Sequence, residues 1–476
     1  MPGLADLDAT AQAELVSRGE AEPRDLVEAA IDRIERHDPE LGAVVTPLFE
    51  LARAAAAAPE LPAGRFRGVP FLLKDLGSEA AHTPHYEGMG ALSRRAHKSQ
   101  RDSYVTALFR SAGFILAGKS ATCELGLLPT TEPLALGPTR NPYDPAMSAG
   151  GSSGGAAASV AAGLVPVAHG TDGGGSIRIP AACCGLVGLK PSRGRISLGP
   201  RQSEIGTGLG TEGVITRSVR DAAGILDVLA RPMPGDPCPL SPPREPFVTS
   251  VGRPPPRLRI AVWRGFVSPS GARELASPAC QAAADEIARV LSTAGHRITE
   301  APYPALDHAA FPRLFQKVWG AVAGAGLRHW SRVLGSPLEA EDVEPTTWRL
   351  AELGAAQSAA DYLHTCAELQ TAARQSAAIW DDFDVVLTPA LAQPPLPLGQ
   401  FFDPDTALDR AARLSPFTAP FNVSGEPAIA IPAGKTRGDL PIGVQLAAPL
   451  GREDLLLSIA GVIERARPFA HPATRA

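Results

Sequence analysis

Two serines in glycine-rich turns are the residues of this chain best suited to nucleophilic chemistry. Ser152 stands in the turn Gly150–Gly155. Ser176 stands 24 residues further on and directly follows Gly173–Gly175. Because glycine has no Cβ, turns of this kind let backbone N–H groups approach a bound group closely. A serine hydroxyl needs a base to take its proton, so the pattern predicts a hydrolytic site with a base nearby.

Lys74 is the candidate base. It ends the apolar run Gly68–Leu73, which predicts a buried strand with one charged residue at its end. Burial disfavours the ammonium form, so it lowers the pKa of a lysine and leaves an amine that can accept a proton. His169 lies seven residues before Ser176, but it ends an apolar strand and is interpreted as a structural histidine.

The segments around both serines predict how they meet. Ala156–Ala162 is rich in small, helix-favouring residues, so the first turn is expected to lead into a helix N-terminus. Val165–His169 predicts a short buried strand that runs into the second turn. This arrangement would bring Ser176 beside the start of the helix, next to Ser152.

The segments GGSSGG, TDGGGSIRIPAACCGLVGLKP and GVPFLLKD resemble the amidase signature family of serine hydrolases. The resemblance covers nearly the whole chain, since it includes GKSATCELG, TTEPLALGPTRNP, PFNVSGEPAIAIPAG and LPIGVQLAAPLGREDLLL. Among members, the chain is most similar to the branch that includes 6-aminohexanoate cyclic dimer hydrolases. The resemblance to the glutaminyl-tRNA amidotransferase subunit is weaker.

The resemblance implies a role for each of the three candidates. Ser176 corresponds to the nucleophile and Lys74 to the base. Ser152 corresponds to the serine that bridges them, and its peptide bond with Gly151 is cis in the family. Ser153 stands beside the bridging position, but the comparison with the family favours Ser152.

The resemblance also implies the groups around the scissile carbonyl. Gly126 corresponds to a residue of the acyl pocket, and the following Leu127 and Leu128 predict an apolar wall there. The oxyanion hole, which stabilises a tetrahedral intermediate, corresponds to the backbone N–H groups of Gly173, Gly174, Gly175 and Ser176.

Supporting residues, and two positions at which the chain departs from the family pattern, complete the predicted site. Asp172 and Arg178 flank the nucleophile and are expected to brace its turn through hydrogen bonds and an ion pair. Asp75 is expected to orient the neighbouring base. The family usually has Thr or Ile at the position of Gly173, so we expect a looser turn. Cys183 stands where an aromatic or small residue is common, and neither departure removes a catalytic group.

Other patterns are interpreted as structural. Cys183 and Cys184 lie in an apolar, helix-like run and are predicted to be buried, inert thiols. Gly113–Ser120 fits the nucleotide-binding pattern G-x4-G-K-[ST], but its middle residues FILA predict a strand rather than a phosphate-binding turn. No His, Asp and Glu cluster has metal-ligand spacing, so neither a metal nor another cofactor is expected.

Composition argues against several classes of protein. The formal charge of −5 predicts no basic surface for nucleic acid or anionic lipid. The six cysteines do not have the spacing of a disulfide framework, which fits a reducing compartment. Since neither a signal peptide nor an apolar run of about 18 residues is apparent, a cytoplasmic protein without membrane contact is expected.

Strand and helix signals alternate over residues 66–230, which is typical of a mixed, mostly parallel sheet covered by helices on both faces. The predicted fold is a single α/β amidase signature domain over residues 1–476. Within it, 1–65 form an N-terminal helical cap and 66–230 the catalytic core. Residues 231–380 form a proline-rich crossing and a helical insertion, and 381–476 return to the sheet.

The helical insertion carries four aromatic residues that are expected to be core or pocket wall, namely Trp319, Trp330, Tyr362 and Trp380. Its predicted helices are Pro278–Ala294, Ala309–Leu334 and Ala355–Trp380. The glycine-rich segment 200–213 is predicted to be a lid that sets substrate choice.

The sequence therefore predicts an amidohydrolase that cleaves small-molecule amides through an acyl-enzyme. Carbamates (urethanes) and esters present the same carbonyl geometry and stay open as substrates. An amidotransferase-type subunit that needs a partner is the alternative of another class. A homodimer is also left open.

Overall fold

One sheet of eleven strands runs through the computed structural model, which describes residues 3–301 and 306–470. Its strand order is β1–β3–β2–β6–β8–β7–β14–β15–β13–β9–β12. Their bounds are β1 (Val44–Pro47), β2 (Pro70–Lys74), β3 (Ile115–Ser120), β6 (Val167–Asp172), β7 (Val187–Lys190), β8 (Thr211–Thr216), β9 (Arg259–Val262), β12 (Arg297–Glu300), β13 (Val385–Pro389), β14 (Ala428–Lys435) and β15 (Pro441–Ala447). Two small hairpins pair β4 (Arg140–Asn141) with β5 (Asp144–Ser148), and β10 (Gly265–Val267) with β11 (Arg273–Leu275).

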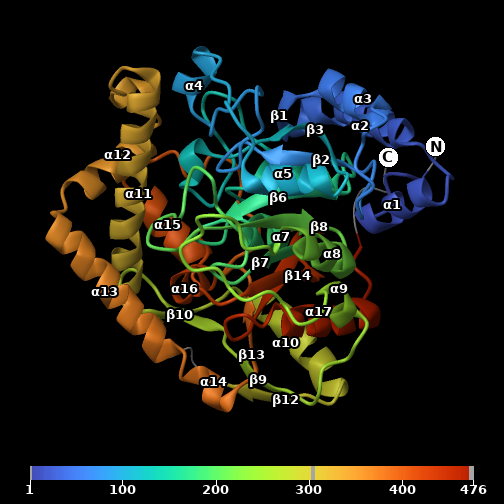
Figure 1. Cartoon of the computed structure of the whole chain (residues 1–476). Helices are drawn as coiled ribbons and strands as arrows, with labels where there is room; N and C mark the ends of the chain where they lie inside the picture. The colour runs from blue at the N-terminus through green and yellow to red at the C-terminus, as the bar shows by residue number, and fades with distance from the viewer. Residues whose placement is uncertain (1–2, 302–305, 471–476) are drawn as a thin grey trace.

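The helices surround this sheet (Figure 1). Those before the middle of the chain are α1 (Ala9–Ser17), α2 (Pro23–Leu41), α3 (Phe49–Ala57), α4 (Gly90–Arg94), α5 (Tyr104–Ser111), α6 (Gly154–Ala161), α7 (Arg178–Cys183), α8 (Val219–Leu229) and α9 (Val248–Val251). Those after it are α10 (Pro278–Thr293), α11 (Phe311–Leu334), α12 (Pro345–Ala355), α13 (Ala359–Ser376), α14 (Ile379–Asp382), α15 (Ala407–Leu414), α16 (Ala419–Ser424) and α17 (Glu453–Ala466). Two 3₁₀ turns span Glu124–Gly126 and Ala340–Asp342.

The sheet is mixed, as predicted. Parallel pairing occurs in two blocks, β3–β2–β6 and β13–β9–β12. The remaining neighbours are antiparallel, from the edge strand β1 to the central β7, β8, β14 and β15. The parallel block around β2 and β6 is the part that carries Lys74 and the turn of Ser176.

Helices cover both faces of the sheet, because successive side chains of each strand point to opposite sides. In β2, Phe71 and Leu73 join one hydrophobic core together with α5, α8, α10 and α17. Leu72 joins the other core together with α2, α6 and α7. Lys74 follows Leu72 by two positions, so the alternation directs it to the face that α6 and α7 cover.

Several predicted elements match the structure, and two do not. Helices α10 and α11 lie within two residues of their predicted bounds, and the FILA segment of the rejected nucleotide-binding pattern enters β3. The N-terminal cap is not wholly helical, because β1 pairs antiparallel with β3. The predicted helix Ala355–Trp380 is also wrong at both ends: α12 ends at Ala355, α13 spans Ala359–Ser376, and a short α14 follows.

The insertion forms one flank of the molecule, where α11, α12 and α13 lie together (Figure 1). Leu327 and Trp330 of α11 pack against Met89 and Leu92 of the core segment, so α11 is fixed beside the sheet. Strands β9 and β12 of the same segment join the main sheet, in keeping with a single domain. The segment boundaries at 65, 230 and 380 stay predictions. Within the described ranges, the helices are too short or too polar for a membrane crossing.

Candidate active site

Lys74 lies at the end of β2 with its side chain fully buried. Its Nζ lies 2.7 Å from Ser152 Oγ and 2.9 Å from Thr171 Oγ1. Thr171 is a site residue that the sequence interpretation missed, although it precedes Asp172 in the same strand β6. Two hydroxyls therefore hold the amine at the position that a proton acceptor for Ser152 requires.

Burial changes the acidity of this lysine. Removal from water lowers the pKa of Lys74 to about 8, while nearby acidic groups, Cys123 and Glu212 foremost, act in the opposite direction. About half of the side chain is then the neutral amine near pH 8, and more of it above that pH. The predicted lowering of its pKa by burial agrees with this environment.

Ser152 lies in the turn that leads into α6, and its peptide bond with Gly151 is cis. The turn is tightly enclosed, because a Cβ on Gly151 would come within 2.0 Å of the Thr130 carbonyl oxygen. Gly126 lies beside the hydroxyl: its φ is +66°, and a Cβ there would lie 2.4 Å from Leu76 Cδ2 and 3.2 Å from Ser152 Oγ. Glycine at these two positions therefore allows the close packing of the segments around Ser152.

Ser176 lies in the turn between β6 and α7, with 7 % of its surface exposed against 1 % for Ser152 and none for Lys74. It is thus the most exposed of the three. Its carbonyl oxygen accepts a hydrogen bond of 3.2 Å from the Ser153 N–H, which ties the two glycine turns together. Ser153 Oγ donates to the Thr171 carbonyl oxygen instead of contacting Lys74, so its role is to join the turn to β6.

The backbone N–H groups of the second turn point to no protein acceptor. Over residues 3–301 and 306–470, none of the N–H groups of Gly173, Gly174, Gly175 and Ser176 donates a hydrogen bond. Gly175 has a φ of +135°, which a residue with a side chain rarely adopts, and the Gly174 carbonyl accepts from Thr418 Oγ1 at 2.7 Å. The turn is thus anchored through the Gly174 carbonyl group, while its backbone N–H donors stay available to a ligand.

Asp172 and Arg178 brace this turn as predicted. Arg178 is fully buried and donates to both carboxylate oxygens of Asp172, at 2.8 and 2.9 Å. Asp172 also accepts from the Ile177 N–H at 3.1 Å. Burial alone would raise the pKa of Asp172, but the charge and hydrogen bonds of Arg178 hold it well below its usual range.

Asn422 extends the brace and was not identified from the sequence. Its side-chain amide donates to Asp172 and to the Leu209 carbonyl oxygen, and its Oδ1 accepts from Arg178 at 2.6 Å. The segment PFNVSGEP, which the family resemblance includes, was the only signal for it. Its contacts join the C-terminal part of the chain to the nucleophile turn.

We predict that Arg178→Gln lowers the free energy of unfolding by about 3–5 kcal/mol, because it leaves the buried Asp172 carboxylate without its counter-charge. Denaturation in urea, followed by circular dichroism, measures the loss. Arg259→Gln is the matched control, since its partner Asp384 is partly exposed and a much smaller loss is expected. Equal losses in the two variants would contradict the bracing role.

The other residues that the sequence singled out have structural roles, and the prediction for one of them needs correction. His169 is buried, hydrogen-bonded to Glu212, and accepts from the Lys74 backbone N–H. Asp75 does not contact Lys74: it forms a buried ion pair of 2.9 Å with Lys119 and accepts from the Tyr86 N–H. The prediction that Asp75 orients the base is therefore wrong, because the Lys119 ammonium competes for its carboxylate.

The two adjacent cysteines are buried in α7 and directly after it. Burial raises the pKa of Cys183 to about 12 and that of Cys184 well above its ordinary value. Both thiols are thus poor nucleophiles. Among the residues described, no group of three or more His, Cys, Asp or Glu side chains could hold a metal ion.

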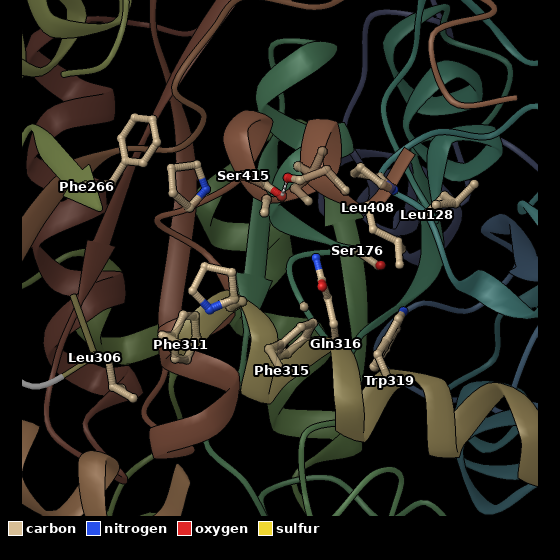
Figure 2. A pocket seen from close by; sticks show the side chains of 18 of the residues that line it. Leu128, Ser176, Phe266, Leu306, Phe311, Phe315, Gln316, Trp319, Leu408 and Ser415 are labelled. Carbon is tan, nitrogen blue, oxygen red and sulfur yellow. Dashed lines mark hydrogen bonds between the residues drawn. The ribbon is translucent and has the colours of Figure 1, made fainter. Parts of the chain in front are cut away.

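Two cavities meet at Ser176. The apolar cavity, of about 110 Å³, is lined largely by aromatic and aliphatic side chains (Figure 2); among them are Leu128, Trp263, Phe266, Phe311 and Phe315. The polar cavity, of about 300 Å³, also contains charged and hydroxyl side chains; among them are Glu87, Ser152, Thr171, Arg201, Glu204 and His329. Both are lined by Gly126, Leu127, Ser176 and Trp319, and Leu128 lines the apolar one. That Leu127 and Leu128 form the wall of an acyl pocket stays a prediction.

Segment 200–213 forms one side of the polar cavity. Arg201 fixes it there, since its guanidinium contacts Glu87 at 3.3 Å and His329 of α11 at 3.2 Å. The same guanidinium lies over the Trp330 ring, 5.7 Å from its centroid. The segment thus contacts a cavity that Ser176 also lines, and its roles as a lid and in substrate choice stay predictions.

The space beside Gly173 that a side chain would need is filled by Trp319. A Cβ on Gly173 would come within 2.7 Å of the Trp319 ring, so the indole occupies the space that Thr or Ile would need. Of the other aromatic residues of the insertion, Trp330 lines the polar cavity, and Trp380 donates to Glu426 at 2.5 Å. Tyr362 packs against the larger core.

Comparisons with known proteins show which families and structures the whole chain resembles. The model of the Amidase family matches residues 25–457. A 6-aminohexanoate-cyclic-dimer hydrolase from Pseudomonas sp. (strain NK87) is 39% identical over 474 residues, which cover 97% of this chain and 95% of the relative. A solved structure of 6-aminohexanoate cyclic dimer hydrolase has a TM-score of 0.91 and 37% identity, with 98% of this chain and 97% of that chain covered. A solved bacterial aryl acylamidase of the amidase signature enzymes has a TM-score of 0.89 and 29% identity, with 99% of both chains covered.

Proposed function

The chain belongs to the amidase signature family, and from this premise we propose that it hydrolyses amide bonds of small molecules through Lys74, Ser152 and Ser176. The observation that carries the proposal is the 2.7 Å contact between Lys74 Nζ and Ser152 Oγ, together with the cavity that Ser152 and Ser176 both line. A neutral amine at this position can accept a proton that passes through one hydroxyl from another.

The proposed reaction begins when Ser176 Oγ attacks the carbonyl carbon. Its proton passes to Ser152 Oγ, and the Ser152 proton passes to Lys74 Nζ. The negative oxygen of the tetrahedral intermediate accepts hydrogen bonds from the N–H groups of residues 173–176, which have no protein acceptor in the described chain. Donors of this kind contribute about 3 kcal/mol each in comparable hydrolases.

Collapse of the intermediate breaks the carbon–nitrogen bond. The proton on Lys74 returns through Ser152 to the leaving nitrogen, and the acyl group stays on Ser176 as an ester. Water then enters, loses a proton to the same two residues, and attacks the ester carbonyl. Release of the acid restores the Ser176 hydroxyl, so every proton is returned within one cycle.

The substrate class follows from the relatives and the cavities. The relatives are a cyclic dimer hydrolase and an aryl acylamidase, and the apolar cavity beside Ser176 has room for an aromatic or aliphatic acyl group. We therefore propose cyclic and linear amides with an apolar acyl part as substrates. Carbamates and esters are proposed as further substrates because their carbonyl group has the same geometry.

We predict that the isolated chain reacts with a serine-directed fluorophosphonate at Ser176 and hydrolyses 6-aminohexanoate cyclic dimer and acyl anilides. Mass spectrometry of the labelled peptide and steady-state rates on a panel of amides, carbamates and esters measure both. Turnover of small primary amides alone would contradict the proposed substrate class. Activity that appears only after a second protein is added would favour a partner-dependent amidotransferase subunit. Gel filtration would then show a complex of the two proteins.

A further inference from the structure

Trp319 stands between the two cavities. It lies on α11, and its indole lines both of them beside Ser176. Figure 2 shows the indole at the apolar cavity. Three contacts fix the ring. Its Nε1 donates to the Leu127 carbonyl oxygen at 2.9 Å, it stacks on Phe315 with ring centroids 5.4 Å apart, and it packs against Gly173.

The position of Ser152 indicates which half of an amide each cavity receives. This step rests on the proposed function, in which Ser152 gives a proton to the leaving nitrogen. Ser152 and Thr171 line the polar cavity and not the apolar one. The amine half must therefore lie in the polar cavity, and the acyl half is left with the apolar cavity.

The chemistry of the walls agrees with this division. Aromatic and aliphatic side chains form most of the wall of the apolar cavity, which Asp307, His308 and Gln316 also line, and an alkyl or aryl acyl group would be removed from water there. Glu204, which is exposed, faces the polar cavity together with Arg201 and His329. Hydroxyl or amino groups on the amine half could form hydrogen bonds there, whereas an alkyl chain could not.

We propose that Trp319 is the specificity-determining residue that keeps the two halves of the substrate apart. The enzyme then selects amides that combine a long or aromatic acyl group with an amine that carries a polar group. The indole acts as a fixed wall: it blocks the acyl group from the polar cavity and an apolar amine from the apolar cavity. Nothing in this role requires Trp319 to take part in proton transfer.

Two substrate series test the partition. In the first, the amine is p-nitroaniline and the acyl group runs from acetyl to octanoyl. In the second, the acyl group is hexanoyl and the amine is either pentylamine or 5-aminopentanol. We expect the native chain to prefer long acyl groups and 5-aminopentanol in kcat/KM. Trp319→Ala should reduce both preferences at least about tenfold, because either half can then enter either cavity.

Two further variants test whether the effect is specific to the aromatic ring at position 319. Trp319→Phe keeps a ring at this place and should retain most of both preferences, although it loses the hydrogen bond to Leu127. Trp348→Ala removes an indole from α12 that lines neither cavity, so both preferences should be unchanged. Should Trp319→Ala fail to fold in a thermal unfolding assay, Trp319→Leu provides the same measurement.

The outcomes distinguish this inference from the proposed function. Unchanged preferences in Trp319→Ala, with Ser176 still labelled by fluorophosphonate, would overturn the partition and leave the hydrolase intact. A native chain that shows neither preference would overturn it too. Absence of Ser176 labelling in the native chain would contradict the proposed function itself.

Discussion

Ser176→Ala is expected to reduce amide hydrolysis by about 10⁴-fold or more, because the variant has no oxygen that can form the acyl-enzyme. What remains would come from the N–H donors of the turn and from substrate binding. The native chain and the variant are compared by steady-state rates on an acyl anilide and by the burst of product in the first turnover. The variant should also fail to react with fluorophosphonate.

Ser153→Ala is the matched control for this variant. Ser153 lies next to the bridging serine, but its hydroxyl donates to the Thr171 carbonyl oxygen and does not contact Lys74. Its replacement should therefore cost far less activity and keep the labelling of Ser176. If Ser176→Ala retained a burst, or if Ser153→Ala were the more damaged variant, the assignment of the nucleophile would be wrong.

Lys74→Met is expected to lower kcat/KM by about 10³-fold and to remove its dependence on alkaline pH. Burial lowers the pKa of Lys74 to about 8, so below this pH most of the side chain is an ammonium that cannot accept a proton. In the native chain kcat/KM should thus rise with pH and level off above about pH 8. The variant has no amine at this position, and its residual activity should show no such rise.

Lys190 provides the control for this pH profile. It is a second fully buried lysine, and burial lowers its pKa to about 7. Its Nζ donates to the Pro191 carbonyl oxygen, and it lines neither cavity at Ser176. Lys190→Met should keep the rise near pH 8. If the rise of kcat/KM with pH were absent in Lys190→Met and present in Lys74→Met, Lys74 would be excluded as the base.

The sequence predicted the parts of the site that depend on short stretches of chain. The apolar run before Lys74 identified a buried strand end, and the two glycine turns identified places where the backbone can approach a ligand. The pairing of Asp172 with Arg178 was also predictable, because the two residues stand close together around the nucleophile. In each case, neighbours along the chain are also neighbours in space.

The sequence interpretation missed contacts between residues that lie far apart along the chain. Asp75 follows the base, which favoured a role in orienting it, but its carboxylate pairs with Lys119 on the adjacent strand. Thr171 took the place beside the amine instead. The missing side chain at Gly173 predicted a loose turn, yet an indole 146 positions later in the chain fills that space.

By itself, then, the sequence determined the candidate catalytic groups, the glycine turns and the α/β class, since residue type, local spacing and side-chain alternation are properties of the chain. Only the tertiary structure decided which hydroxyls contact Lys74, how Asn422 braces the turn, and which walls surround the two cavities. Those contacts join segments that are distant in sequence. They form only when the sheet and α11 bring the segments together, because burial and hydrogen bonding act between neighbours in space.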